Sequence, residues 1–243
     1  MEYDDNKNKK SSSGGFWNLN FLPNAITCLN LFSGCAGVWL AFKGNYAGAT
    51  VAILMSALFD FLDGMAARML KAYSDIGKEL DSLADVVSFG VVPGAIIFAM
   101  LSPDYVHSYS FIGFLIPIFS ALRLAKFNID ERQTTSFLGL PTPANAIFWG
   151  GLSVSYSSWL SNNIYVLITL TIIFSVLLVA EIPMFSLKFK NLTWKDNQRQ
   201  FIFILVSLFL IILLRINAIA PIILWYILLS IILIFVNKNK RMD

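Results

Sequence analysis

The chain has 243 residues, of which 57% are hydrophobic and 14% are charged, with a net charge of +3 and a mean hydropathy of +0.68. Because an ordinary soluble domain carries about one quarter charged residues, this composition excludes a soluble globular protein and favours one integral membrane domain. The small positive charge is typical of a membrane-facing basic surface, so no nucleic-acid partner is expected.

The chain opens on a polar, charged and Gly/Ser-rich segment, residues 1–18, which is predicted to be a disordered tail because it cannot bury enough apolar surface. A membrane-spanning helix needs about 20 mostly apolar residues, and about eight later stretches meet this requirement. The predicted fold is therefore all-α, with spans at 22–42, 46–68, 80–100, 109–126, 143–160, 164–184, 200–214 and 217–236.

The basic residues predict the orientation of these helices, because Lys and Arg in short loops are retained on the cytoplasmic side. If both termini are cytoplasmic, only Lys43 and Arg215 of the 18 basic residues fall on the far side. The cytoplasmic residues are then Lys7, Lys9, Lys10, Arg68, Lys71, Lys78, Arg123, Lys126, Arg132, Lys188, Lys190, Lys195, Arg199, Lys238, Lys240 and Arg241. An even number of spans with cytoplasmic termini is the expectation.

Four aspartates lie beside very apolar sequence in DFLDGMAARMLKAYSDIGKELDSLAD, residues 60–85. Asp60 and Asp63 share one face at the end of the second predicted helix, and Asp81 and Asp85 share one face on the opening turns of the third. A short connection makes these helices antiparallel neighbours. Both pairs are therefore expected to open at the same membrane face, which the orientation above makes cytoplasmic.

A divalent cation explains why this much negative charge is kept there. One Asp in an inserted helix costs about 2.5 to 3.5 kcal/mol near the membrane centre, and like charges repel in addition. An all-oxygen cluster suits Mg²⁺, Mn²⁺ or Ca²⁺ rather than zinc. The competing interpretation is a solvated cluster paired with Arg68, Lys71 and Lys78, which explains one aspartate more readily than four.

The surrounding residues narrow the chemistry further. Gly64, Ala67 and Gly77 are small, and they let either a ligand or a neighbouring helix approach closely. His107 is the sole histidine and falls in a loop on the far side, so a proton acceptor at this face must be a carboxylate. A metal-rich acidic cluster of this kind typically handles phosphoryl groups.

The complete pattern is Asp60-x2-Asp63-Gly64-x2-Ala67-Arg68-x8-Gly77-x3-Asp81-x3-Asp85. It resembles the signature of the CDP-alcohol phosphatidyltransferases at every fixed position. The resemblance implies that the four aspartates bind a divalent metal, Mg²⁺ or Mn²⁺ with Ca²⁺ as an alternative, and that Asp85 is also the general base. It implies that Gly64, Ala67 and Gly77 make room for a cytidine nucleotide, with Arg68 beside the phosphates.

Four further stretches, 22–34, 84–93, 123–128 and 137–144, resemble the phosphatidylserine synthases of that family. The resemblance implies a six-helix core at 19–184, CDP-diacylglycerol and L-serine as substrates, and a homodimer. The segment 185–243 matches nothing assignable and is expected to add two transmembrane helices.

Two other groups of polar residues are candidate binding residues. Arg123, Lys126 and Arg132 form a basic cluster for the serine carboxylate or the lipid phosphate, unless they contact anionic lipid head groups. Arg123 is the favoured member because a planar guanidinium grips a carboxylate with two hydrogen bonds. Polar residues also recur at three-residue spacing on the first predicted helix, and they bind either the nucleotide or neighbouring helices: Asn24, Thr27 and Asn30.

The sequence therefore predicts an enzyme of the bacterial or archaeal-type inner membrane that transfers the phosphatidyl group of CDP-diacylglycerol to serine. Another acceptor alcohol, glycerol 3-phosphate or inositol phosphate, is the nearest alternative. A cation transporter is the alternative of a different class, because intramembrane carboxylates also mark ion paths. Transport favours charges spread along the membrane normal, whereas these four gather at one face.

Overall fold

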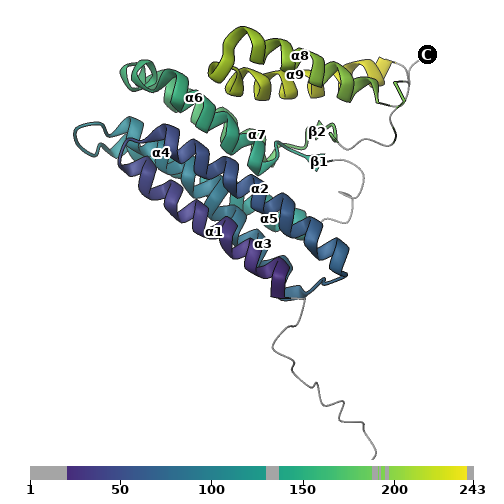
Figure 1. Cartoon of the computed structure of the whole chain (residues 1–243). Coiled ribbons are helices and arrows are strands. Elements are labelled where there is room, and N and C mark those ends of the chain that lie inside the picture. The colour runs from purple at the N-terminus through teal and green to yellow at the C-terminus, as the bar shows by residue number, and fades with distance from the viewer. Residues whose placement is uncertain (1–20, 130–136, 188–190, 192, 195–196, 240–243) are drawn as a thin grey trace, which may run out of the picture.

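The computed structural model describes residues 21–129, 137–187, 191, 193–194 and 197–239, and these residues are almost entirely helical (Figure 1). The α-helices are α1 (Phe21–Phe42), α2 (Tyr46–Leu70), α3 (Asp75–Asp85), α4 (Val92–Leu101), α5 (Leu115–Ile129), α6 (Thr142–Asn162), α7 (Ile164–Val179), α8 (Gln198–Leu214) and α9 (Ile219–Asn239). A π-helix, η1 (Val86–Val91), joins α3 to α4, and 3₁₀ turns η2 (Ser108–Phe114) and η4 (Arg215–Ala218) precede α5 and α9.

Five segments of the described chain are long and apolar enough to cross a membrane: Phe21–Phe42, Tyr46–Leu70, Asp75–Leu101, Ser108–Ile129 and Gln198–Phe235. The last segment contains both α8 and α9, which turn back at Arg215, a residue in the left-handed region with φ of 52°. α7 is apolar but has 16 residues, and α6 carries many Gly, Ser and Asn residues. The all-helical membrane fold is confirmed, whereas the number of eight spans stays a prediction.

Successive helices reverse direction across the bundle. In Figure 1 the turns after α1, α4, α6 and α8 lie toward one end, and the connections after α2 and α7 lie toward the other. The turns that carry Lys43 and Arg215 therefore share an end, as the charge pattern requires. Which end faces the cytosol stays a prediction.

The connection between α2 and α3 is shorter than the sequence indicated. Lys71 ends α2 in the left-handed conformation, and the Ser74 hydroxyl caps α3 by accepting a 3.0 Å hydrogen bond from Gly77 N–H. The third helical segment thus begins at Asp75 rather than at residue 80, and Gly77 lies in the first turn of α3 rather than in the connection. Hydropathy missed this start because residues 75–85 are strongly polar.

The sixth predicted span also ends early. α7 stops at Val179, because Ala180 adopts an extended conformation with φ of −64° and ψ of 143°. A short strand follows, β2 (Pro183–Met184), and pairs antiparallel with β1 (Phe137–Leu138). Pro183 lacks the N–H that a continuing helix would need. Residues 180–184 are therefore not part of the helix that the sequence predicted over 164–184.

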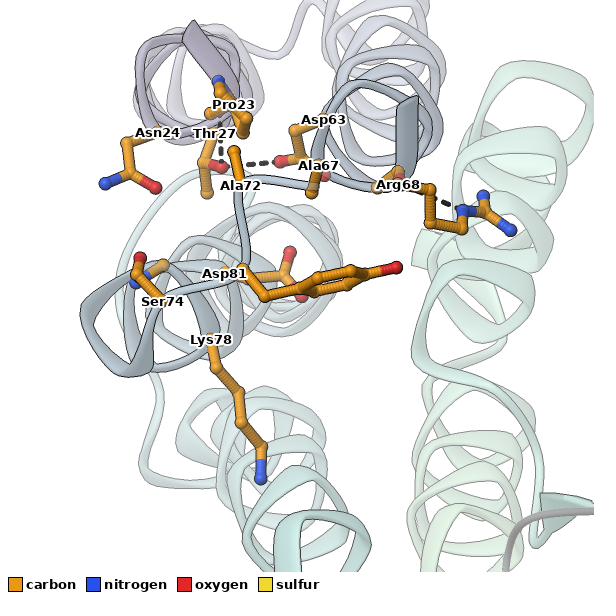
Figure 2. A pocket seen from close by; sticks show the side chains of 13 residues that line it. Pro23, Asn24, Thr27, Asp63, Ala67, Arg68, Ala72, Ser74, Lys78 and Asp81 are labelled. Carbon is orange, nitrogen blue, oxygen red and sulfur yellow. Dashed lines mark hydrogen bonds between the residues drawn. The ribbon is translucent and has the colours of Figure 1, made fainter. Parts of the chain in front are cut away.

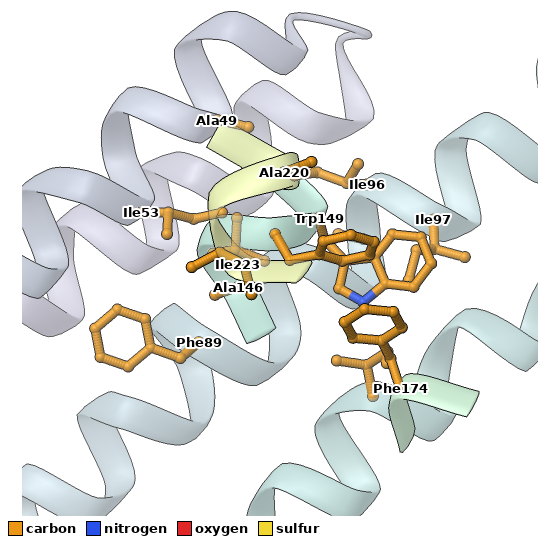
Figure 3. Packing of buried hydrophobic residues seen from close by; sticks show 14 of the residues in the cluster. Ala49, Ile53, Phe89, Ile96, Ile97, Ala146, Trp149, Phe174, Ala220 and Ile223 are labelled. Atoms are coloured by element: carbon orange, nitrogen blue, oxygen red, sulfur yellow. The ribbon is translucent and has the colours of Figure 1, made fainter. Parts of the chain in front are cut away.

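The apolar core lies where α2, α4, α6 and α7 meet, with α9 closing one side (Figure 3). Trp149 of α6 is fully buried, and its neighbour Phe148 stacks on Phe174 of α7 with ring centroids 3.9 Å apart. α9 approaches α6 closely, because a Cβ at Gly151 would meet the Ile219 side chain at 2.5 Å. This packing fixes the helices whose ends carry the polar residues described below.

We expect Trp149→Ala to lower the melting temperature of the purified protein in detergent, measured by circular dichroism. Removing a buried aromatic side chain leaves a cavity and costs about 3 to 5 kcal/mol in protein cores. Trp159→Ala is the matched control, because Trp159 lies on the same helix but is 54% exposed. Equal effects of the two substitutions would contradict the placement of Trp149 in the core.

Candidate active site

Three of the four aspartates converge at one end of the bundle. Asp60 and Asp63 come from the last turns of α2 and Asp81 from α3, and each offers a carboxylate oxygen within 4.8 Å of the others. Asp63 is buried, and the other two are half-buried. Asp85 lies outside this group of three but lines a pocket together with Asp60 and Asp81, so its role as a fourth ligand stays a prediction.

The trio has the chemistry expected of a site for a hard cation. Its donors are all carboxylate oxygens, the ligands that Mg²⁺, Mn²⁺ and Ca²⁺ prefer. Asp81 Oδ1 is buried and has no hydrogen-bond partner among the described residues. A buried carboxylate oxygen without a donor is costly unless a cation binds it, so this atom suits a metal ligand.

Thr27 of α1 positions the acidic trio. Its hydroxyl donates a 2.6 Å hydrogen bond to Asp63 Oδ2, and it lies 3.0 Å from the carbonyl oxygen of Pro23 on its own helix. Thr27 was a candidate for either nucleotide binding or contact between helices. The structure shows the second contact, which orients the Asp63 side chain toward α1.

Asn30, one turn further along α1, holds Asp85 in a similar way. Its Nδ2 donates to Asp85 Oδ1 over 3.2 Å, and its main-chain carbonyl accepts hydrogen bonds from Ser56 of α2 and Ser88 of η1 at 3.1 and 3.0 Å. All four residues are buried. The π-helix begins directly after Asp85, and such irregular turns frequently occur at functional sites. Asp85 is thus oriented by α1 and by the start of η1.

A pocket of about 350 Å³ opens beside the trio between α1, α2 and α3 (Figure 2). We call it the Gly64 pocket. It brings together all six residues predicted to bind the nucleotide: Asn24, Thr27, Gly64, Ala67, Arg68 and Gly77. Asp63 and Asp81 also line it, so two members of the acidic trio belong to its wall.

The two glycines of this pocket differ in what surrounds them. A Cβ at Gly64 would find only Arg68 Nη2, at 4.0 Å, so the space above Gly64 is open. A Cβ at Gly77 would meet Asn24 Oδ1 and Ser74 Oγ at 2.9 Å, so Gly77 lets α3 pack against α1. Arg68 donates from Nε to the Gly64 carbonyl at 2.9 Å, and Figure 2 shows its guanidinium turned away from Asp63 and Asp81.

A second pocket, of about 370 Å³, lies on the other side of Asp81. We call it the Arg123 pocket, and its polar lining includes Asp60, Asp81, Asp85 and Arg123. Of the predicted basic cluster, only Arg123 lines it. Lys126 is exposed and lines neither pocket, and Arg132 lies outside the described residues.

Comparison with known proteins decides the family. The model of the family described as CDP-alcohol phosphatidyltransferase matches residues 20–236. The chain belongs to the CDP-alcohol phosphatidyltransferase family. A CDP-diacylglycerol–serine O-phosphatidyltransferase of Helicobacter pylori is 30% identical over 234 residues, which cover 91% of this chain and 97% of the relative. The enzyme of the same name in Bacillus subtilis is 36% identical over 143 residues, 57% of this chain and 78% of the relative.

An archaeal relative carries a related name. The archaetidylserine synthase of Methanothermobacter thermautotrophicus is 36% identical over 128 residues, which cover 52% of this chain and 54% of that protein. The CDP-alcohol phosphatidyltransferase match spans both pockets and all the helices that line them.

Sequence reasoning missed several residues of the site. Ser56 and Ser88 were not singled out, because a serine within an apolar stretch carries no signal of its partner. Asn30 was noted as polar, but its contact with Asp85 needs the packing of α1 on α3. Thr142 lines the Arg123 pocket and lies in the stretch 137–144, whose resemblance to synthases was the one available signal.

We expect Asn30→Ala to lower the transferase activity of this family member about 10- to 100-fold, because a buried carboxylate without its donor loses about 1 to 3 kcal/mol of stabilisation. The main-chain contacts of Ser56 and Ser88 remain in this variant. Ser33→Ala is the control, since Ser33 lies on α1 and donates to Ala52 O at 3.0 Å without contacting a carboxylate. Activity assays on both variants test this prediction. Equal losses of activity in Asn30→Ala and Ser33→Ala would show that Asn30 has only a structural role.

Proposed function

We propose that this protein transfers the phosphatidyl group of CDP-diacylglycerol to the hydroxyl of L-serine, which yields phosphatidylserine and CMP. The observation that carries the proposal is the match over 91% of the chain to a relative named CDP-diacylglycerol–serine O-phosphatidyltransferase. The geometry supports it, because two pockets flank one acidic trio. A reaction between two substrates needs such an arrangement.

The two pockets have linings suited to different substrates. The Gly64 pocket contains open space above a glycine and the polar side chains of α1, and it is proposed to take the cytidine nucleotide. The Arg123 pocket contains a buried guanidinium beside Asp85, and it is proposed to take serine, with Arg123 on the carboxylate. Asp81 lines both pockets, so the transferred phosphorus is proposed to lie beside it.

Asp85 is proposed to be the general base. Its carboxylate takes the proton from the serine hydroxyl, while the serine oxygen forms a bond to the phosphatidyl phosphorus. The bond from phosphorus to the CMP oxygen breaks, and CMP leaves with that electron pair. Asn30 keeps the Asp85 carboxylate oriented during this proton transfer.

Asp60, Asp63 and Asp81 are proposed to hold the divalent metal, Mg²⁺ or Mn²⁺, with Asp85 as a further candidate ligand. The metal, when bound, would neutralise phosphate charge and stabilise the leaving nucleotide. Thr27 contributes by fixing the Asp63 side chain, and the unpartnered Oδ1 of Asp81 supplies a free ligand atom.

The setting of the enzyme is also a proposal. We propose that the site and both termini face the cytosol, because the basic residues gather at that end. We also propose a core at 19–184 followed by a pair of helices at 185–243; α8 and α9 form a hairpin in Figure 1, and the family match runs through both. A homodimer is expected from the family resemblance.

The decisive experiment measures CMP release from CDP-diacylglycerol by the purified protein in detergent. We expect release that requires L-serine and stops when a chelator removes the divalent metal. Glycerol 3-phosphate and inositol phosphate serve as alternative acceptors. Release with one of these instead of serine would keep the family reaction and overturn the proposed acceptor.

We expect Asp85→Asn to abolish serine-dependent CMP release while nucleotide binding, measured by calorimetry with CMP, stays within about threefold, because the amide cannot accept the proton. Asp75→Asn is the matched control, since Asp75 lies exposed in the first turn of the same helix. A near-normal rate for Asp85→Asn would remove Asp85 from the role of base.

We expect Gly64→Leu to weaken CMP binding by at least about tenfold without lowering the melting temperature. The new side chain would enter the Gly64 pocket, and within 4 Å its Cβ would meet only the end of a flexible arginine. Calorimetric titration with CMP measures the first effect and thermal denaturation the second. Unchanged CMP affinity would place the nucleotide elsewhere.

A further inference from the structure

The first turn of α6 forms part of the Arg123 pocket, through Pro141, Thr142 and Pro143. Thr142 is 1% exposed, and its Oγ1 has no hydrogen-bond partner among the described residues. A buried hydroxyl without a partner is unfavourable, so such groups usually bind something when the site is occupied.

The position of Thr142 in the chain explains why its hydroxyl is free. Several buried hydroxyls within helices of this protein donate to the carbonyl four residues earlier, as Thr50 does to Tyr46, Thr171 to Leu167 and Ser230 to Tyr226. Thr142 is the first residue of α6, so no helical carbonyl precedes it at that distance. The flanking prolines hold the chain in this conformation.

Two further features of the same pocket suit a negative group. Arg123 is 7% exposed and lines the same pocket, and its Nε also lacks a hydrogen-bond partner in the part of the chain that the structure describes. The N-terminus of the 21-residue helix α6 adds the positive end of its dipole. The other polar residues of the lining are the acids Asp60, Asp81 and Asp85, the base Lys78, and the neutral Ser82 and Asn128.

We infer that Thr142 donates a hydrogen bond to the α-carboxylate of the amino-acid acceptor, beside the guanidinium of Arg123. This inference rests on the proposed function and adds the orientation of serine. The carboxylate lies at the N-terminus of α6, and the hydroxyl points to Asp85. Thr142 is thereby a residue that selects acceptors with a carboxylate.

The test compares steady-state kinetics of full-length wild type, Thr142→Val, Thr142→Ser and Thr171→Val in detergent, with serine and CDP-diacylglycerol varied in turn. Valine keeps the shape of threonine and removes the hydroxyl. We expect Thr142→Val to raise the KM for serine about 10- to 100-fold, because the variant loses a hydrogen bond to a charged group. The KM for CDP-diacylglycerol is expected to stay within about twofold of the wild-type value. Thr142→Ser and Thr171→Val are expected to stay within about threefold of wild type.

Thr171→Val is a matched control, because Thr171 is fully buried but donates only to its own helix. Ethanolamine, which lacks the carboxyl group altogether, gives a second readout as a competitor of serine. We expect its inhibition constant to be the same in wild type and Thr142→Val. If Thr142→Val is not recovered folded, Thr142→Ala replaces it with the same expectations.

The outcomes separate the inference from the proposed function. Wild type that does not use serine overturns the proposed function, and the inference with it. Wild type that uses serine, with an unchanged KM for serine in folded Thr142→Val, overturns the inference alone. A fall in kcat without a change in that KM, or an equal rise in both KM values, also overturns it, since neither indicates a contact with the acceptor.

Discussion

The repulsion among carboxylates at the ends of α2 and α3 is the constraint on which the rest of the site depends. Three carboxylate oxygens lie within 4.8 Å of one another. At an effective dielectric constant of about 20, each charged pair at that distance repels by about 3 kcal/mol. A helix bundle keeps such a cluster only if other groups stabilise it. Donors on α1 supply part of this stabilisation, and a divalent cation is proposed to supply the rest.

α1 acts as the support for both halves of the acidic site. Thr27 and Asn30, one turn apart, contact Asp63 on α2 and Asp85 on α3 respectively. α1 packs closely on the π-helix, because any side chain at Gly34 would overlap the Ser88 hydroxyl. The short polar side chains of α1 therefore set the spacing between α2 and α3, and so the geometry of the carboxylates.

The sequence predicted the parts of this structure that depend on local pattern. Helical stretches follow from hydropathy, and the aspartate pairs follow from spacings of three and four residues on one helix face. The start of α3 at Asp75 was missed because its signal is the Ser74 cap, within a polar segment that hydropathy passes over. The end of α7 was missed because hydropathy continues beyond Val179, while the backbone turns away to pair β2 with β1.

Contacts between distant segments could not be predicted from one sequence. Asn30 and Asp85 are 55 residues apart, and nothing in either segment indicates that they meet. The same holds for Arg123, which the sequence groups with Lys126 and Arg132 and which is buried in the pocket beside Asp85. Two members of the predicted basic cluster therefore differ in burial: Arg123 is buried and is a candidate ligand-binding residue, whereas Lys126 is exposed.

Asp81 lies in the walls of both pockets, between the side proposed for the nucleotide and the side proposed for the acceptor. Phosphoryl transfer places the attacking and leaving oxygens on opposite sides of phosphorus. In the proposed reaction the nucleotide side is formed by α1, α2 and α3, and the acceptor side by α3, α5 and the first turn of α6. Substitutions on α5 and α6 can therefore change the acceptor while the acidic trio and the Gly64 pocket stay intact. This separation gives a physical reason why one helical scaffold can serve a family defined by its CDP-linked donor rather than by its acceptor.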